Sequence, residues 1–185
     1  MSAEIVLIAL SLPILFAIHN MEEVVVYEYF MRKNRPKLAT RLPKFVAARI
    51  TKIAAGHTTA SFALGITILT LLFAIISYLA VWQNWHILWV IWLAGTLVFT
   101  VQLVIHIVSA LIWRGYAFGT ITSVLFLPVF IIMIQRLVHM MTFSWTEVII
   151  AFLAAYMVGY IGGIALLHGW LMPAFDRRFS EQHDA

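Results

Sequence analysis

The 185-residue chain contains no cysteine, so it can form neither a disulfide framework nor a thiolate site for metal binding or catalysis. Charged residues make up 11% of it, less than half of the roughly 25% found in soluble domains. The hydrophobic share is 63%, well above the roughly 45–50% of such domains. This composition excludes an ordinary soluble protein and indicates an integral membrane protein. The length predicts one compact membrane domain over residues 1–185, without a separate soluble domain.

Long apolar stretches follow one another along the chain, each long enough for the roughly 20 residues with which a helix crosses a bilayer. They cover residues 3–30, 53–82, 86–113, 117–135 and 145–172. The first stretch lacks a basic beginning and a small-residue cleavage site, so we expect a retained span rather than a secretory signal. The sequence therefore predicts an all-α, polytopic bundle of five transmembrane helices.

Basic residues are distributed unevenly between the connections. The connection 31–52 carries eight of them and no acidic residue, and Arg114, Arg177 and Arg178 fall on the same side of the membrane. Only Arg136 falls on the opposite side. Because basic residues favour the cytoplasmic side, we expect an inner (plasma) membrane protein with its amino terminus outside and its carboxyl terminus cytoplasmic. The net charge of +4 then reflects topology and contact with anionic membrane lipids, and we expect no nucleic-acid partner.

Ionisable side chains lie inside the first predicted span, at His19, Glu22 and Glu23. Residues 5–18 before them carry no charge, and residues 24–27 after them continue the apolar run. One acidic residue at the centre of a membrane helix costs roughly 2.5–3.5 kcal/mol, so both glutamates should be protonated, paired or bound to a ligand. Because residues three and four positions apart share a helix face, we expect the three side chains to point the same way.

A second polar stripe lies in the third predicted span, where Gln102, His106 and Ser109 recur at spacings of four and three residues. If this stripe faces the first one, the two enclose a buried polar pocket in the cytoplasmic half of the membrane. Arg114 and Tyr116 should lie just below that pocket, at the end of the span.

The two polar regions resemble the HXXEE-domain bacterial membrane proteins. The naming motif of that family matches His19, Glu22 and Glu23. A second region is similar to the family pattern His106-x-x-Ser109, followed by Arg114-x-Tyr116-x-x-Gly119-x-x-Thr122. The resemblance covers residues 10–135 and implies a small protein of about five spans, whose family has no agreed biochemical activity. Phe118 departs from the pattern, which has proline before the glycine.

The ionisable residues of the two stripes suit a metal site. Imidazole and carboxylate ligands bind zinc, iron or manganese, and a histidine followed by a glutamate three residues later occurs in metal sites of helical bundles. We predict that zinc or iron is bound by His19, His106 and one of the two glutamates, Glu23 in the leading assignment, with His57 as a further ligand. His168 is the alternative to His57 as this further ligand.

Three protein ligands and one water would form an open catalytic site, in which the metal lowers the pKa of the water toward neutrality. Glu22 and Glu23 are therefore the candidate catalytic residues, because the glutamate left free of the metal could act as general base. The candidate substrate-binding residues are Gln102, Ser109, Arg114 and Tyr116. The leading hypothesis is a metal-dependent membrane enzyme, a hydrolase or oxidoreductase, acting on a lipid or isoprenoid-like hydrophobic small molecule. The pattern HExxH is absent, which excludes an ordinary zinc peptidase.

Other functions fit the same residues. A protonated carboxyl group and a neutral histidine form an acid–base pair suited to a metal-free isomerase. The cluster could also relay protons or cations in a small transporter, although the chain has no obvious inverted repeat. A non-enzymatic scaffold would use the cluster only as a structural network. Ala155, Gly159 and Gly163, four residues apart, permit close helix packing and thus a possible homodimer.

Overall fold

The computed structural model describes residues 1–37, 40, 44–45, 48, 58–157, 171 and 173–175. Within these residues the regular structure is helical and no strand occurs. In chain order the helices are α1 (Ala3–Asn34), the 3-10 helix η1 (Arg35–Lys37), α4 (Thr59–Gln83), α5 (His86–Trp113), α6 (Thr120–Met140) and α7 (Trp145–Ala154). Four of them, α1, α4, α5 and α6, are long and apolar enough to cross a membrane. The predicted fold class, a polytopic helical membrane bundle, is confirmed.

The long helices correspond to the first four predicted spans. The fifth, predicted over 145–172, is described as an apolar helix only for Trp145–Met157, and most of its remainder lies outside the described residues. Gly159 and Gly163, on which the predicted dimer contact depends, lie there too. Half of the basic connection 31–52 is likewise outside the described part of the chain.

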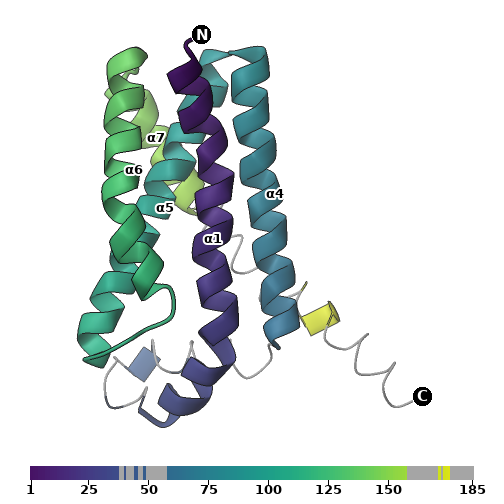
Figure 1. Cartoon of the computed structure of the whole chain (residues 1–185), viewed down its shortest axis with the longest axis vertical. Helices are drawn as coiled ribbons and strands as arrows, with labels where there is room; N and C mark the ends of the chain where they lie inside the picture. Colours follow the sequence, from purple (N-terminus) through teal and green to yellow (C-terminus); the bar gives the residue numbers. More distant parts are fainter. Residues whose placement is uncertain are drawn as a thin grey trace.

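The long helices run in alternating directions along the chain (Figure 1), and short connections join α4 to α5, α5 to α6 and α6 to α7. Helix α1 packs against α4 and α6, and α5 packs against α4, α6 and α7. The reversal between α4 and α5 occurs at Asn84, whose backbone is left-handed with φ at 50°. The side-chain oxygen of Asn84 accepts a hydrogen bond of 3.0 Å from Trp89 Nε1, which fixes the start of α5 against this turn.

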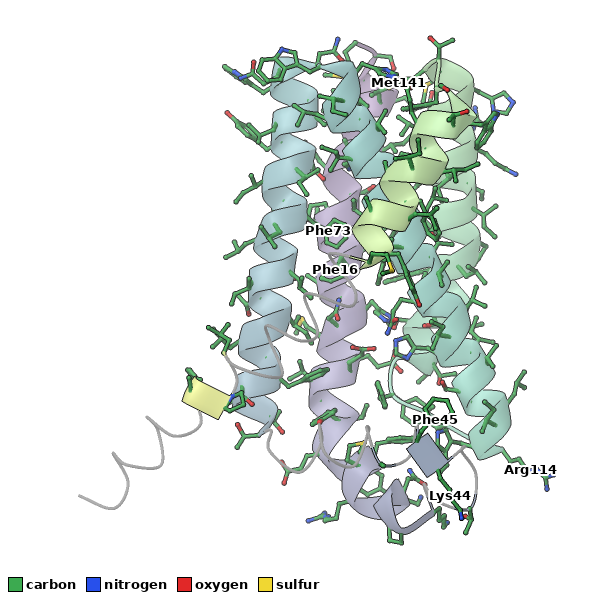
Figure 2. The ribbon with its side chains drawn as sticks, turned by 180° about the vertical axis from the view of Figure 1, so that it is seen from behind. Phe16, Lys44, Phe45, Phe73, Arg114 and Met141 are labelled. Carbon is green, nitrogen blue, oxygen red and sulfur yellow. The ribbon has the colours of Figure 1, made fainter. Side chains whose placement is uncertain are left out.

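Aromatic rings form the core above the polar residues of α1. Phe16 contacts Phe73 and Phe99 with ring centroids 4.7 and 4.9 Å apart, and Phe99 contacts Phe130 at 5.0 Å. Figure 2 shows Phe16 of α1 and Phe73 of α4 facing each other between their helices. Phe99 also lies 5.2 Å from the ring of His19, so this apolar layer ends at the first residue of the polar cluster.

Large apolar side chains also cover the outer faces of the helices. Leu7, Val25, Leu111 and Leu153 are each more than half exposed in the bundle. Soluble proteins rarely expose extended apolar patches, whereas these residues suit contact with lipid chains. The two ends of the bundle differ: Lys44 and Arg114 lie at one end and Met141 at the other (Figure 2).

Candidate metal centre

Three buried side chains from two helices converge in the bundle. His19 and Glu23 lie one turn apart on α1, and His106 comes from α5. Their exposed fractions are 1%, 6% and 3%. Glu23 Oε1 lies 2.6 Å from His106 Nε2 and 3.6 Å from His19 Nε2, and one ligand atom of each residue lies within 4.8 Å of the others. The two polar stripes predicted from the sequence therefore face each other at these three residues.

Two of the converging atoms are buried without a hydrogen-bond partner among the described residues, His19 Nε2 and Glu23 Oε1. Glu23 Oε1 is 3.6 Å from His19 Nε2, which is too long for a hydrogen bond, and its 2.6 Å contact with His106 Nε2 is a close ion-pair contact without the alignment of a hydrogen bond. Buried polar atoms are nearly always paired, and leaving one unpaired costs about 1–3 kcal/mol. Nitrogen and oxygen atoms that point at one another without hydrogen bonds are arranged as ligands are around a cation.

The spacing of the atoms also suits a metal ion. Ligand atoms about 2.1 Å from a tetrahedral ion lie about 3.4 Å from one another. The distance of 3.6 Å between His19 Nε2 and Glu23 Oε1 is close to this value. The distance of 2.6 Å between His106 Nε2 and Glu23 Oε1 would have to open by less than about 1 Å. Small side-chain rotations are enough for such a change.

Glu22 points to the start of α6 instead of the cluster. Its Oε1 accepts hydrogen bonds from Tyr116 Oη at 2.6 Å and from the backbone N–H of Ile121 at 3.1 Å. Its Oε2 accepts from the backbone N–H of Thr122 at 2.8 Å and from Thr122 Oγ1 at 2.5 Å. The first N–H groups of a helix have no partner within it, and lipid offers none. Glu22 therefore accepts hydrogen bonds from the otherwise unpaired N–H groups at the beginning of α6.

The connection between α5 and α6 returns toward the cluster from the end of α5 (Figure 1). Trp113 lies seven residues beyond His106, which is roughly 10 Å along the helix, whereas Gly119 packs against Glu23. Tyr116 was expected just below the polar pocket, but this return brings it to Glu22. Burial and the hydrogen bond to Glu22 raise the pKa of Tyr116, so its hydroxyl remains a donor at neutral pH.

Gly119 and Phe118 close the cluster from the side of this connection. Gly119 has φ at 73°, and a Cβ atom there would lie 3.1 Å from both Glu23 Oε1 and His19 Cε1. The ring of Phe118 lies 5.4 Å from that of His106. With Phe99 on the other side, aromatic rings border the cluster toward both ends of the bundle. The cluster is therefore set in apolar surroundings.

A family model described as a protein of unknown function with an HXXEE motif matches residues 10–134. The match covers more than half of the chain and includes every residue of the cluster. The chain belongs to the HXXEE family. No curated protein and no solved structure matches it. The resemblance inferred from the residues is thereby confirmed. In the HXXEE motif of this chain, the histidine and the second glutamate join the cluster, whereas the first glutamate binds the start of α6.

The remaining predicted site residues lie at varying distances from the cluster. Gln102 Nε2 is 2.9 Å from His106 Nε2, and Gln102 Oε1 is buried without a hydrogen-bond partner in the described part of the chain. Ser109 is half-buried and is not one of the converging residues. Arg114 is exposed at the end of α5 and projects away from the bundle (Figure 2). His57 and His168 lie outside the described residues.

Two members of the second HXXEE region had no assigned role in the sequence prediction. Thr122 Oγ1 lies 2.8 Å from His19 Nδ1 and 2.5 Å from Glu22 Oε2, so it connects the histidine of the motif with its first glutamate. Gly119 provides the space that the cluster needs. The family spacing Gly119-x-x-Thr122 was the signal for both, because it combines a turn residue with a hydroxyl at the start of a helix.

Proposed function

We propose that the protein is a membrane metalloenzyme that binds one divalent ion through His19, Glu23 and His106 and acts on a hydrophobic substrate. The observation that carries the proposal is the pair of buried atoms without hydrogen-bond partners, His19 Nε2 and Glu23 Oε1, beside a third ligand atom. A metal ion would satisfy both atoms and offset the charge of the buried carboxylate. The HXXEE motif would then be a ligand motif of this family.

The donor set favours zinc or iron. Two imidazoles and one carboxylate occur in hydrolytic zinc sites and in non-haem iron(II) oxygenases. Three protein ligands leave coordination positions for water or substrate, which is typical of catalytic rather than structural sites. When bound, such a metal supplies Lewis-acid chemistry and activates water. The amide nitrogen of Gln102 contacts His106 Nε2, and its buried Oε1, which has no hydrogen-bond partner among the described residues, would accept a hydrogen bond from a metal-bound water or a substrate.

The surroundings of the cluster favour a lipid or isoprenoid-like substrate. Apolar rings border the site, and the helices around it present apolar side chains to the membrane. Glu22 is already engaged by four hydrogen-bond donors, so we assign it a positioning role instead of general-base chemistry. The buried carboxylate of Glu23 remains the acidic group nearest to the reacting atoms.

The metal content of the purified protein tests this proposal. Protein extracted in detergent without chelator should contain about one zinc or iron per chain by elemental analysis. The apo protein should regain the ion, and the free energy of unfolding should rise by about 4 kcal/mol at a free metal concentration 1,000-fold above Kd. The loaded protein should convert a component of a total lipid extract, detected by mass spectrometry. Folded protein that contains no metal and gains no stability from zinc, iron or manganese would contradict the proposal.

One observation favours a second function. The 2.6 Å separation of His106 Nε2 and Glu23 Oε1 matches a short contact between a charged donor and a carboxylate. If a small side-chain rotation aligned these two groups, a proton shared between them would serve metal-free acid–base catalysis or proton transfer. In that case, the metal experiment gives a negative result, and proton flux into liposomes or isomerase activity is lost in Glu23→Gln.

We also propose that the amino terminus is outside the cell and that the basic end of the bundle is cytoplasmic, in the inner membrane. The positive-inside rule supports this orientation, as do Lys44 and Arg114 at one end of the bundle. The absence of cysteine makes a direct test possible. In intact cells, an impermeant maleimide should label Thr142→Cys and should label Lys44→Cys only after permeabilisation. The reverse pattern would invert the assignment.

A further inference from the structure

Glu22 is the one ionisable residue of the HXXEE motif that does not reach the proposed metal site directly. The hydroxyl of Thr122 lies between Glu22 and the site. Its Oγ1 is 2.5 Å from Glu22 Oε2 and 2.8 Å from His19 Nδ1. These two contacts link the carboxylate to the outer nitrogen of the buried imidazole through one hydroxyl group.

The positions of the protons follow from the donors and acceptors present. The oxygens of Glu22 accept the backbone N–H groups of Ile121 and Thr122, so both act as acceptors. The threonine hydroxyl has one proton, and its contact with Glu22 Oε2 is the shorter of its two contacts. Donating this proton to Glu22 leaves Thr122 Oγ1 as an acceptor. The proton between Thr122 and His19 must then be on His19 Nδ1.

A neutral imidazole that is protonated at Nδ1 carries a free lone pair at Nε2. In His19 this is the atom that is buried without a hydrogen-bond partner and that lies 3.6 Å from Glu23 Oε1. Histidines that bind metals generally donate their other ring N–H to an acceptor, which sets the tautomer and the ring orientation. Thr122 provides such an acceptor, and Glu22 orients the hydroxyl.

We propose that Glu22 and Thr122 are positioning residues that hold His19 in its Nδ1-protonated tautomer and thereby make Nε2 available as a ligand. That Nε2 serves as a metal ligand rests on the proposed function. The tautomer itself is a property of the metal-free protein, so it is tested separately. The proposal explains why the motif contains two adjacent glutamates: one contributes a ligand atom and the other controls the histidine.

Nitrogen NMR of metal-free protein with ¹⁵N-labelled histidine tests the tautomer. The His19 signals are identified by their loss in His19→Gln, among the seven histidines of the chain. The wild type should show a protonated Nδ1 and an unprotonated Nε2. Thr122→Val removes the hydroxyl at nearly constant volume, and it should abolish this preference and weaken metal binding by about 10–100-fold. Thr122→Ser should restore both properties.

Thr120→Val is the matched control, because the Thr120 hydroxyl lies at the same end of α6 but bonds the backbone of Ala117. This variant should keep the His19 tautomer even if α6 loses stability. Wild-type protein with the proton on His19 Nε2 would overturn the proposal, and so would an unchanged tautomer in Thr122→Val. An Nδ1-protonated His19 in a protein that binds no metal would uphold the positioning role and reject the metalloenzyme.

Discussion

Replacing His106 by alanine is expected to lower the affinity of the protein for zinc or iron by more than about 100-fold. Loss of a residue that only supports a metal ligand already costs about 10–100-fold, and His106 is proposed as a ligand itself. Its Nε2 is one of the three converging atoms, and the next imidazole in the described cluster is that of His19. Two ligands in apolar surroundings do not compensate for the dehydration of a divalent ion. Competition with a chromophoric chelator measures the affinity.

His139→Ala provides the matched control for this variant. His139 is an exposed histidine of α6, and its Nδ1 lies 2.7 Å from the carbonyl oxygen of Gln135 in the same helix. Its loss should leave metal affinity unchanged, and gel filtration should show the same folded species for both variants. Equal metal affinity in His106→Ala and the wild type would place the ion elsewhere. A comparable loss in both variants would indicate non-specific binding to histidine.

The sequence predicted the helices well because hydrophobic length decides whether a segment crosses a membrane. It also predicted that the polar stripe of α5 would enclose a buried pocket with the first helix if the two faced each other; His106 of that stripe joins the cluster, whereas Ser109 does not. The pairing of His19 with Glu23 follows similarly, because residues four positions apart lie above one another. These inferences need only helical geometry and the cost of burying charge.

The different orientations of Glu22 and Glu23 could not be derived in this way. Both glutamates lie close to the face of His19, and the rotation of α1 against α5 and α6 decides which one enters the cluster. That rotation depends on packing between helices, including the contacts of Phe16 with the rings of two neighbouring helices. Tertiary packing of this kind leaves no periodic signal in a single sequence.

The position of the α5–α6 connection could not be predicted from the sequence either. Its six residues could lie at the membrane surface, as expected for Arg114 and Tyr116, or return into the bundle. The return places the first N–H groups of α6, those of Ile121 and Thr122, beside α1 within the bundle, where lipid offers them no partner. Glu22 is that partner, and this contact across the bundle is visible only in three dimensions.

Gly119→Ala is expected to destabilise the protein and to disturb the cluster in the same step. A side chain at a φ of 73° costs roughly 1–2 kcal/mol, because the left-handed conformation crowds the Cβ atom. That atom would also lie 3.1 Å from Glu23 Oε1 and His19 Cε1, tighter than ordinary packing. The free energy of unfolding in detergent should fall by at least this amount. Metal affinity should fall as well, because the proposed ligands His19 and Glu23 must move.

Gly115→Ala separates these effects from a general sensitivity of the connection. A Cβ atom on Gly115 meets nothing within 4 Å, although the residue lies in the same short segment. Its replacement should change the free energy of unfolding by less than about 0.5 kcal/mol and leave metal affinity intact. Stability lost equally in both variants would mean that the whole connection is sensitive to added side chains, and that neither the left-handed backbone of Gly119 nor its position beside Glu23 is special. A Gly119→Ala protein with wild-type stability and metal affinity would contradict the close packing of this residue on the proposed ligands.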